Sequence, residues 1–197
     1  MIKKIPLTLN TSQGADGKQI VEFLRGEITS DGEIACTYSD GSGYRGSFNE
    51  DRFHGVGNYV WSDGSRYEGQ LADGLPHGTG TILLSDGHRY EGDWQNGVAE
   101  GEGTETMPDG GRYTGEWRNG VKHGHGEAIF GDGKKYTGEW KDNMQHGKGA
   151  LFFTDGSRYE GQWVNDRIFG KGTLIFWDGK RYKGEWKDGK FKVLKVL

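Results

Sequence analysis

Four histidines stand at equivalent places along the chain, each directly before a glycine: His54, His77, His123 and His146. Histidine binds transition metals and transfers protons near neutral pH. However, the ligands of one zinc ion must all lie about 2.0–2.3 Å from the metal. Equivalent positions in consecutive two-strand units lie about 9–10 Å apart. We therefore expect structural histidines in loops, and no metal site.

Two glycine patterns resemble functional loops but lack the parts that the chemistry needs. Gly-x-Gly recurs six times, yet no helix follows it to offer its N-terminus to a phosphate. The recurring Asp-Gly lacks the alternating oxygen ligands and the final glutamate of a calcium loop. Cys36 is the only cysteine, so it forms no internal disulfide, and no nucleophile–base pair accompanies it. These patterns predict a protein that is not an enzyme and needs no cofactor.

The sequence repeats every 23 residues. Each unit contains a tyrosine, a glycine two residues later and a large apolar residue two further on. The tyrosines are Tyr44, Tyr67, Tyr90, Tyr113, Tyr136, Tyr159 and Tyr182, and the large apolar residues are Phe48, Leu71, Trp94, Trp117, Trp140, Trp163 and Trp186. Gly-x-Gly follows in six units, and Asp-Gly closes each of these. This density of glycine excludes long helices.

Each unit is predicted to be a β-hairpin. Tyr-x-Gly-x-Trp alternates with period 2, so its aromatic residues share one face of a strand, and charged residues lie on the other face. An apolar run after Gly-x-Gly predicts the second strand, which Met107-Pro108 interrupts in one unit. Asp-Gly predicts the tight hairpin turn, and the connection around residues 119–124 is predicted to be longer and looser. Glycine leaves room for a neighbouring aromatic ring to lie over bare backbone.

Composition narrows the fold class further. The chain has 197 residues, of which 37 are glycine, 32% are hydrophobic and 13% are aromatic. Disordered chains are poor in aromatic residues, so these proportions favour an extended, aromatic-packed architecture. No run reaches the ~20 apolar residues of a transmembrane helix, and the first ten residues do not form a signal peptide. The prediction is one elongated all-β domain, a twisted antiparallel meander of 23-residue hairpins, in a cytoplasmic protein.

The charge is unevenly distributed. Residues 1–132 hold 11 basic and 21 acidic side chains, a net charge of −10, whereas residues 133–197 hold 14 basic and 8 acidic ones, a net charge of +6. Such an asymmetry favours self-association or an anionic partner at one end. Carboxylates alternate with the basic residues in the strands, so we expect no nucleic-acid binding.

Three segments are predicted from the repeats. Residues 1–43 are degenerate N-terminal cap repeats, in which residues 16–20 resemble residues 178–182. Residues 44–189 form the array of about seven units, the last one partial. Residues 190–197 are apolar with interspersed lysines and form either a last strand or a short helix that closes the end.

Two candidate surfaces follow from these patterns. Exposed aromatic residues are good anchors for a peptide, and the candidate protein-binding aromatic face is Trp94, Tyr113, Trp117, Tyr136, Trp140, Tyr159 and Trp163. Basic residues attract anionic lipid, and the candidate lipid-binding residues are Lys134, Lys135, Arg158, Lys180 and Arg181. The alternatives are that the aromatic residues only pack the interior and that the basic residues form a salt-bridged solvent face.

Tyr-x-Gly-x-Trp, followed by His-Gly-x-Gly and Asp-Gly with a period of 23 residues, resembles the MORN repeat (membrane occupation and recognition nexus). The resemblance covers residues 44–189 and, more weakly, residues 16–43. The sequence departs from the pattern at Phe48 and Leu71 in place of tryptophan, and at Glu100 and Phe169 in place of histidine.

The resemblance implies an elongated, all-β, non-enzymatic array. Members that consist of the array alone look like scaffolds that organise cytoskeletal or ciliary components and often form homodimers. Lipid binding is proposed within the family, which makes a peripheral membrane module for anionic phospholipids or phosphoinositides the alternative function. An accessory role beside a lipid kinase is a third possibility by analogy. The implied location is cytoplasmic, at the cytoskeleton, a cilium or a membrane surface.

Overall fold

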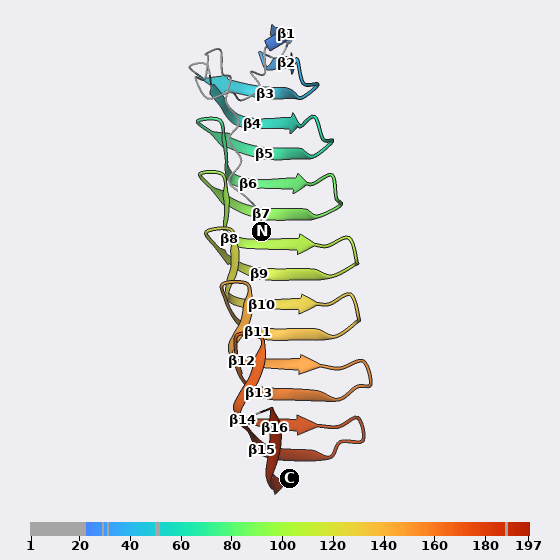
Figure 1. Cartoon of the computed structure of the whole chain (residues 1–197). Helices are drawn as coiled ribbons and strands as arrows, with labels where there is room; N and C mark the ends of the chain where they lie inside the picture. Colours follow the sequence, from blue (N-terminus) through green and yellow to red (C-terminus); the bar gives the residue numbers. More distant parts are fainter. Residues whose placement is uncertain (1–22, 29, 31, 50–51, 188) are drawn as a thin grey trace, which may run out of the picture. The chain divides into compact units, whose positions relative to one another are not determined.

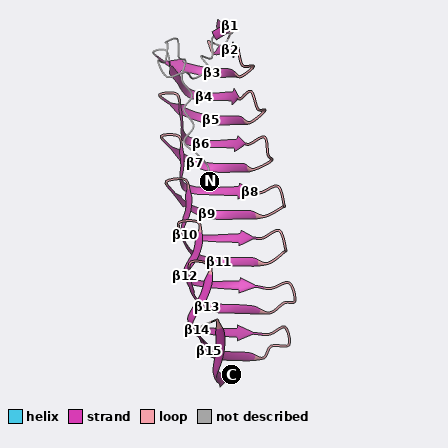
Figure 2. Cartoon of the chain, viewed as in Figure 1, coloured by secondary structure: helices cyan, strands magenta, loops and turns pink. Residues whose placement is uncertain are grey.

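The computed structural model describes residues 23–28, 30, 32–49, 52–187 and 189–197. Residues 1–22 of the predicted N-terminal cap repeats, with the repeat-like residues 16–20, lie outside these. The described residues contain strands and turns but no helix, as Figure 2 shows, and so nothing in them forms a helix that could cross a membrane. By its internal contacts the chain divides into two compact units, residues 2–101 and residues 102–197.

The described strands form one antiparallel sheet in which each strand pairs with the next along the chain (Figure 1). They are β1 (Phe23–Ile28), β2 (Ile34–Tyr38), β3 (Gly43–Asn49), β4 (Arg52–Val60), β5 (Arg66–Ala72), β6 (Leu75–Leu83), β7 (Arg89–Gln95), β8 (Val98–Thr106), β9 (Arg112–Arg118), β10 (Val121–Ile129), β11 (Lys135–Lys141), β12 (Met144–Phe152), β13 (Arg158–Val164), β14 (Arg167–Ile175), β15 (Arg181–Lys187) and β16 (Lys190–Val196). The predicted all-β antiparallel meander is confirmed. Residues 190–196 form a strand and not a helix.

The two kinds of turn are the reverse of the prediction. Asn119-Gly120 alone joins β9 to β10, and both residues have positive φ, 50° and 75°. This is the geometry of the two-residue type I′ turn, which matches the twist of the strands. The Asp-Gly connections are the longer ones, because five residues separate β6 from β7. The segment around residues 119–124 is therefore a tight turn followed by strand.

The Asp-Gly connections form a regular turn of their own. The Leu84 N–H donates to the His88 oxygen at 2.8 Å, and the Gly87 N–H donates to the Leu84 oxygen at 2.9 Å. The Asp86 carboxylate accepts the His88 N–H at 3.0 Å, as turn aspartates often do. The same arrangement contains Met107-Pro108, where proline favours the second position of a type I turn. Pro108 therefore lies in the turn, and β8 is as long as β6, contrary to the predicted interruption.

Four of the tight turns also link their hairpin to the previous one. The Gly97 N–H donates to the Pro76 oxygen at 2.9 Å, 21 residues earlier. In the unit of residues 102–197, Asn143 makes two such bonds to Lys122, one from its N–H at 3.1 Å and one to its side-chain oxygen at 2.9 Å. These bonds supplement the strand ladders and fix the spacing of consecutive hairpins.

Candidate functional site

The repeated tyrosine packs over glycine backbone, as predicted. Tyr136 of β11 lies over Gly138 of its own strand and Gly149 of β12, which pair with each other. Its hydroxyl donates to the main-chain carbonyl oxygen of Glu139 at 3.0 Å. Tyr67, Tyr90 and Tyr113 make the equivalent bond at 2.7–2.9 Å. Burial raises the pKa of the Tyr136 hydroxyl, so this group remains a protonated donor.

The aromatic side chains form an edge-to-face series within each unit. In residues 102–197, Tyr113, Trp140, Tyr136, Trp163 and Tyr159 follow one another with ring centroids 5.1–5.8 Å apart. The indole N–H of Trp140 donates to the Gly126 oxygen at 3.2 Å. In residues 2–101, Trp94 contacts both Tyr67 and Tyr90 in the same way. Such pairs contribute about 0.5–1.5 kcal/mol beyond their burial.

All seven residues of the candidate protein-binding aromatic face are buried. Trp94, Tyr113, Trp117, Tyr136, Trp140, Tyr159 and Trp163 are between 0% and 5% exposed. Within each compact unit these residues lie close together, but they form part of its packed interior. A partner that approaches this face therefore meets the residues around the aromatic series and not the rings themselves.

The histidines lie in strands and not in loops. His123 and His146 belong to β10 and β12, where Gly-x-Gly forms a bulge against the preceding strand. The bulge is held by a side chain that the sequence analysis did not single out, because the Glu139 carboxylate accepts the Lys148 N–H at 2.8 Å. The signal is the acid or amide residue three places after each tyrosine from Tyr67 to Tyr159. Among the described residues, no group of acidic, histidine or cysteine side chains could hold a metal ion.

Four of the five candidate lipid-binding residues are ion-paired. Lys134 contacts Asp132, Lys135 contacts Glu127 and Lys180 contacts Asp178, each at 2.7 Å. Arg158 contacts Glu160 at 2.6 Å, and Arg181 is exposed. The five are spread over three repeats, so the structure does not gather them into one site.

A different set of basic residues is gathered on one face. Lys171 of β14 and five lysines of β15 and β16 lie on the face opposite the aromatic series, where Glu185 is paired with both Lys171 and Lys192 in the sheet. We call this set the lysine face; it comprises Lys171, Lys183, Lys187, Lys190, Lys192 and Lys195. Its sequence signal was the excess of lysine over acid in the last repeats.

Exposed apolar side chains are concentrated in the same repeats. Of the thirteen large apolar side chains exposed among the described residues, eight lie between Val164 and Leu197. One open cavity of about 640 Å³ is lined by residues that include Val164, Ile168 and Phe169. A second, of about 350 Å³, is lined by Leu174, Phe176, Trp177, Asp178, Lys180, Tyr182, Phe191 and Val193. We call the second cavity the C-terminal pocket.

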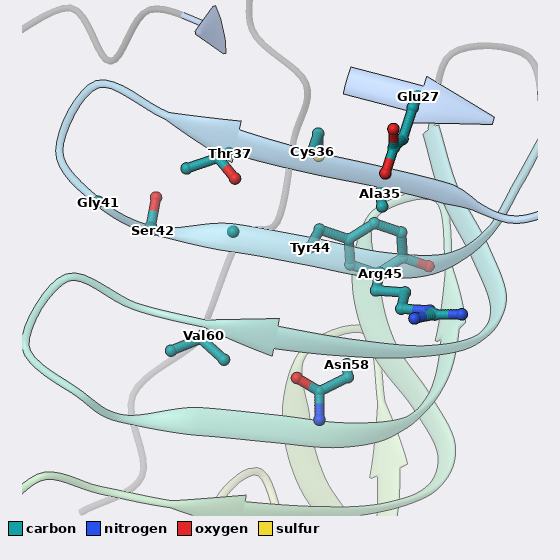
Figure 3. A pocket seen from close by; sticks show the side chains of 11 residues that line it. Glu27, Ala35, Cys36, Thr37, Gly41, Ser42, Tyr44, Arg45, Asn58 and Val60 are labelled. Atoms are coloured by element: carbon teal, nitrogen blue, oxygen red, sulfur yellow. The ribbon is translucent and has the colours of Figure 1, made fainter. Parts of the chain in front are cut away.

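A third cavity, of about 510 Å³, lies in residues 2–101, between β2, β3 and β4 (Figure 3). Arg45 and Asn58 occupy paired positions at its wall, and Arg45 also contacts Glu33 at 3.3 Å. Cys36 is buried beside it, with its sulfur 3.7 Å from the Tyr38 hydroxyl. Burial raises the pKa of Tyr38. These contacts are structural, and they place no base beside the thiol.

Several solved structures have a fold similar to that of this chain. The chain is similar to the TCP domain of SAS-4 (dCPAP) of Drosophila melanogaster, described in complex with a proline-rich motif of Ana2, with 14% identity and a TM-score of 0.54 over 94% of this chain and 100% of that one. It is also similar to the TCP10 domain of CPAP from Danio rerio, with 14% identity and a TM-score of 0.50 over 89% and 99% of the two chains. At this identity the likeness concerns the fold alone.

A search of curated proteins gives no significant match to the sequence. The MORN repeat, in contrast, matches seven consecutive segments: residues 44–66, 67–89, 90–112, 113–135, 136–158, 159–181 and 182–193. These segments cover most of the chain, and their boundaries coincide with the tyrosine period seen in the sheet. The chain therefore belongs to the MORN-repeat family.

Proposed function

We propose that the chain is a non-enzymatic scaffold that binds protein partners through its C-terminal repeats and organises cytoskeletal or ciliary components. The observation that carries this proposal is the concentration of exposed apolar side chains between Val164 and Leu197. Contiguous exposed apolar surface is typical of interaction sites. The complex of a similar domain with a proline-rich motif supports the choice of a peptide segment as the ligand.

Self-association is the second part of the proposal. The net charges of −10 for residues 1–132 and +6 for residues 133–197 favour contact between opposite ends of two copies. A homodimer or larger assembly would let one scaffold hold several partners.

A peptide-display selection on the full chain tests the partner-binding proposal. We expect enriched peptides whose affinity falls about tenfold or more in Phe169→Ser or Trp177→Ser. The matched control is Ile129→Ser, because Ile129 is also exposed but lies outside the apolar concentration. Absence of any enriched peptide, or equal loss in all three variants, would contradict the proposal.

The alternative function is a peripheral membrane module for anionic phospholipids, and the lysine face is the observation that favours it. Liposome co-sedimentation near physiological salt, where the Debye length is about 8 Å, separates the two functions. The membrane proposal predicts retention on phosphatidylserine or phosphoinositide vesicles only, with loss when Lys183, Lys192 and Lys195 are changed to Glu. Because Lys134, Lys135 and Lys180 are ion-paired, their reversal should matter less. No pelleting on any vesicle would eliminate this alternative.

A further inference from the structure

The last repeat breaks the packing rule that the other repeats follow. Tyr67, Tyr90, Tyr113, Tyr136 and Tyr159 are at most 1% exposed, whereas Tyr182 of β15 is only half-buried. The reason lies in β16, where Val193 is paired with Gly184, the place that Gly149 of β12 holds opposite Gly138. The Val193 side chain takes up the space above the backbone that the glycine leaves open. In addition, the Phe191 ring lies over Gly184.

The displaced tyrosine leaves an open aromatic cluster. Tyr182 meets Phe176 edge to face, with ring centroids 5.6 Å apart, whereas the repeat tyrosines from Tyr67 to Tyr159 meet tryptophan. Trp177 is 74% exposed. Together with Phe191 and Val193 these residues line the C-terminal pocket. An aromatic pocket of about 350 Å³ is large enough for one bulky apolar side chain or a proline.

Strand β16 borders this pocket, and its lysines outnumber the carboxylates that are paired with them across the sheet. It is the last strand of the described sheet and pairs with β15 alone among the described strands. Phe191 and Val193 line the pocket, so Lys192 between them points to the opposite face. On that face Lys192 is paired directly with Glu185, whereas Lys195 is paired with Lys183 and Lys190 with Lys187. Like charges at directly paired positions are destabilising.

The charges of the β16 lysines determine which kind of strand can pair with this edge of the sheet. Two copies of β16 paired with each other would bring further lysines together, which disfavours that contact. A strand with carboxylates at alternate positions would relieve the Lys–Lys pairs and bond to the edge N–H and C=O groups that no other described strand pairs with. Its remaining side chains would face the pocket.

We infer that β16 binds an acidic, extended peptide segment of a partner protein. The segment adds to the sheet as a further strand, its carboxylates lie beside Lys190, Lys192 and Lys195, and one bulky apolar side chain enters the C-terminal pocket. Main-chain hydrogen bonds supply affinity and the alternate side chains supply specificity, as in other strand additions. The inference rests on the proposed partner-binding function and identifies the chemistry of the partner.

Fluorescence anisotropy with the full chain tests this inference. The probe is a labelled ten-residue peptide that alternates glutamate with valine and has one central phenylalanine. We expect saturable binding that weakens with salt, and that weakens about tenfold or more in Lys192→Glu/Lys195→Glu and in Phe176→Ser. The matched control is Lys141→Glu/Lys148→Glu, an equal charge change on exposed lysines of β11 and β12, which should leave the affinity within about twofold.

Backbone methylation of the probe supplies a readout that charge attraction alone does not give. Successive N–H groups of a strand point to opposite sides. N-methylation of one alternate set should therefore abolish binding, and methylation of the other set should be tolerated. Tolerance of both sets, binding of a lysine–valine peptide, or equal affinity in all variants would overturn the inference. Competition of the probe by phosphatidylserine vesicles, without any dependence on Phe176, would overturn it as well.

The outcome for β16 and the outcome for the proposed function are separable. If display-selected peptides lose affinity in Phe169→Ser while Lys192→Glu/Lys195→Glu has no effect, the scaffold proposal stands and the strand-addition inference falls. Circular dichroism of each variant establishes that the fold is retained.

Discussion

The phenol ring of Tyr136 lies against the Cα atom of Gly149 on the next strand, so that a Cβ atom at that glycine would overlap the ring. No side chain fits between the two, and the same contact recurs between Tyr113 and Gly126. The contact explains why tyrosine and glycine recur together with the period of the repeat.

Gly149→Ala should therefore destabilise the chain by about 1–3 kcal/mol through overpacking. Gly149 does not have a φ in the left-handed region, so the cost comes from the ring and not from the backbone. The control is a double-mutant cycle with Tyr136→Leu, in which the penalty should shrink. Chemical unfolding gives both numbers, and an unchanged penalty beside leucine would refute the explanation.

Removing hydroxyl groups should distinguish the regular tyrosines from the last one. Tyr136→Phe removes the donor that lies 3.0 Å from the main-chain carbonyl oxygen of Glu139. The substitution should lower the free energy of unfolding by about 1 kcal/mol. Tyr182→Phe should cost close to nothing, because no hydrogen bond of its hydroxyl is found among the described residues. Thermal unfolding of the two variants measures the difference, and equal costs would contradict it.

The turn aspartates should make the fold sensitive to acid. Hydrogen bonds from the Ser157 side chain and N–H hold the pKa of Asp155 below its ordinary value, and the Lys134 side chain lowers the pKa of Asp132 in the same way. A carboxylate with a lowered pKa stabilises the fold above its unfolded pKa, about 3.9, and this stabilisation is lost as the pH falls through the folded pKa. The unfolding midpoint should therefore decrease below about pH 4, and less steeply in Asp155→Asn. A midpoint that does not change from pH 7 to pH 3 would exclude this linkage.

Substitutions at Asn143 should separate backbone strain from hydrogen bonding. Its φ is 69° and its side-chain oxygen accepts the Lys122 N–H. Asn143→Ala loses that bond and adds strain, so we expect a loss of about 1–2 kcal/mol. Asn143→Gly loses the bond but relieves the strain. Its free energy of unfolding should therefore lie between those of the unsubstituted protein and Asn143→Ala. Urea unfolding ranks the three proteins, and alanine at or above glycine would contradict the assignment.

The charge asymmetry should appear in the mass of the protein in solution. Sedimentation velocity at low salt should give a mass that increases with concentration and falls back at about 0.5 M salt, where screening shortens the range of the attraction. One mass at every concentration and salt would remove self-association from the proposed function.

The alternation of tyrosine, glycine and tryptophan was sufficient to predict the strands and the inward face, because few other arrangements place a ring over bare backbone. The two turns could not be ranked from composition. Asn119-Gly120 and Asp86-Gly87 carry equally good turn signals, and only the bond from Leu84 to His88 shows that the second closes a longer loop. The glycines beside the histidines favour a loop, whereas in the structure the Glu139 side chain holds that segment in the sheet.

The candidate surfaces were harder to predict for a different reason. Whether a lysine is free depends on what lies across the strands: Lys135 has Glu127 within 2.7 Å, whereas Lys195 is paired with Lys183. The sequence counts both as positive. Likewise, the period of the aromatic residues indicates which residues share a face. It does not indicate that the rings pack over glycine and are buried, so that a partner cannot contact them.

The bonds that join four of the tight turns to a residue 21 positions earlier, such as Gly97 to Pro76, also bear on how such a chain can evolve. Among the described strands, an internal hairpin pairs with the hairpins before and after it, and these share one sequence pattern. Duplication or loss of a whole 23-residue segment by unequal recombination would give each new boundary the same set of partners as the old one. A gain or loss of any other length would shift the register of the repeats, and a shift by an odd number of residues would turn side chains to the wrong face. We therefore expect genes for such arrays to differ in length in steps of 69 base pairs, since each residue is encoded by three.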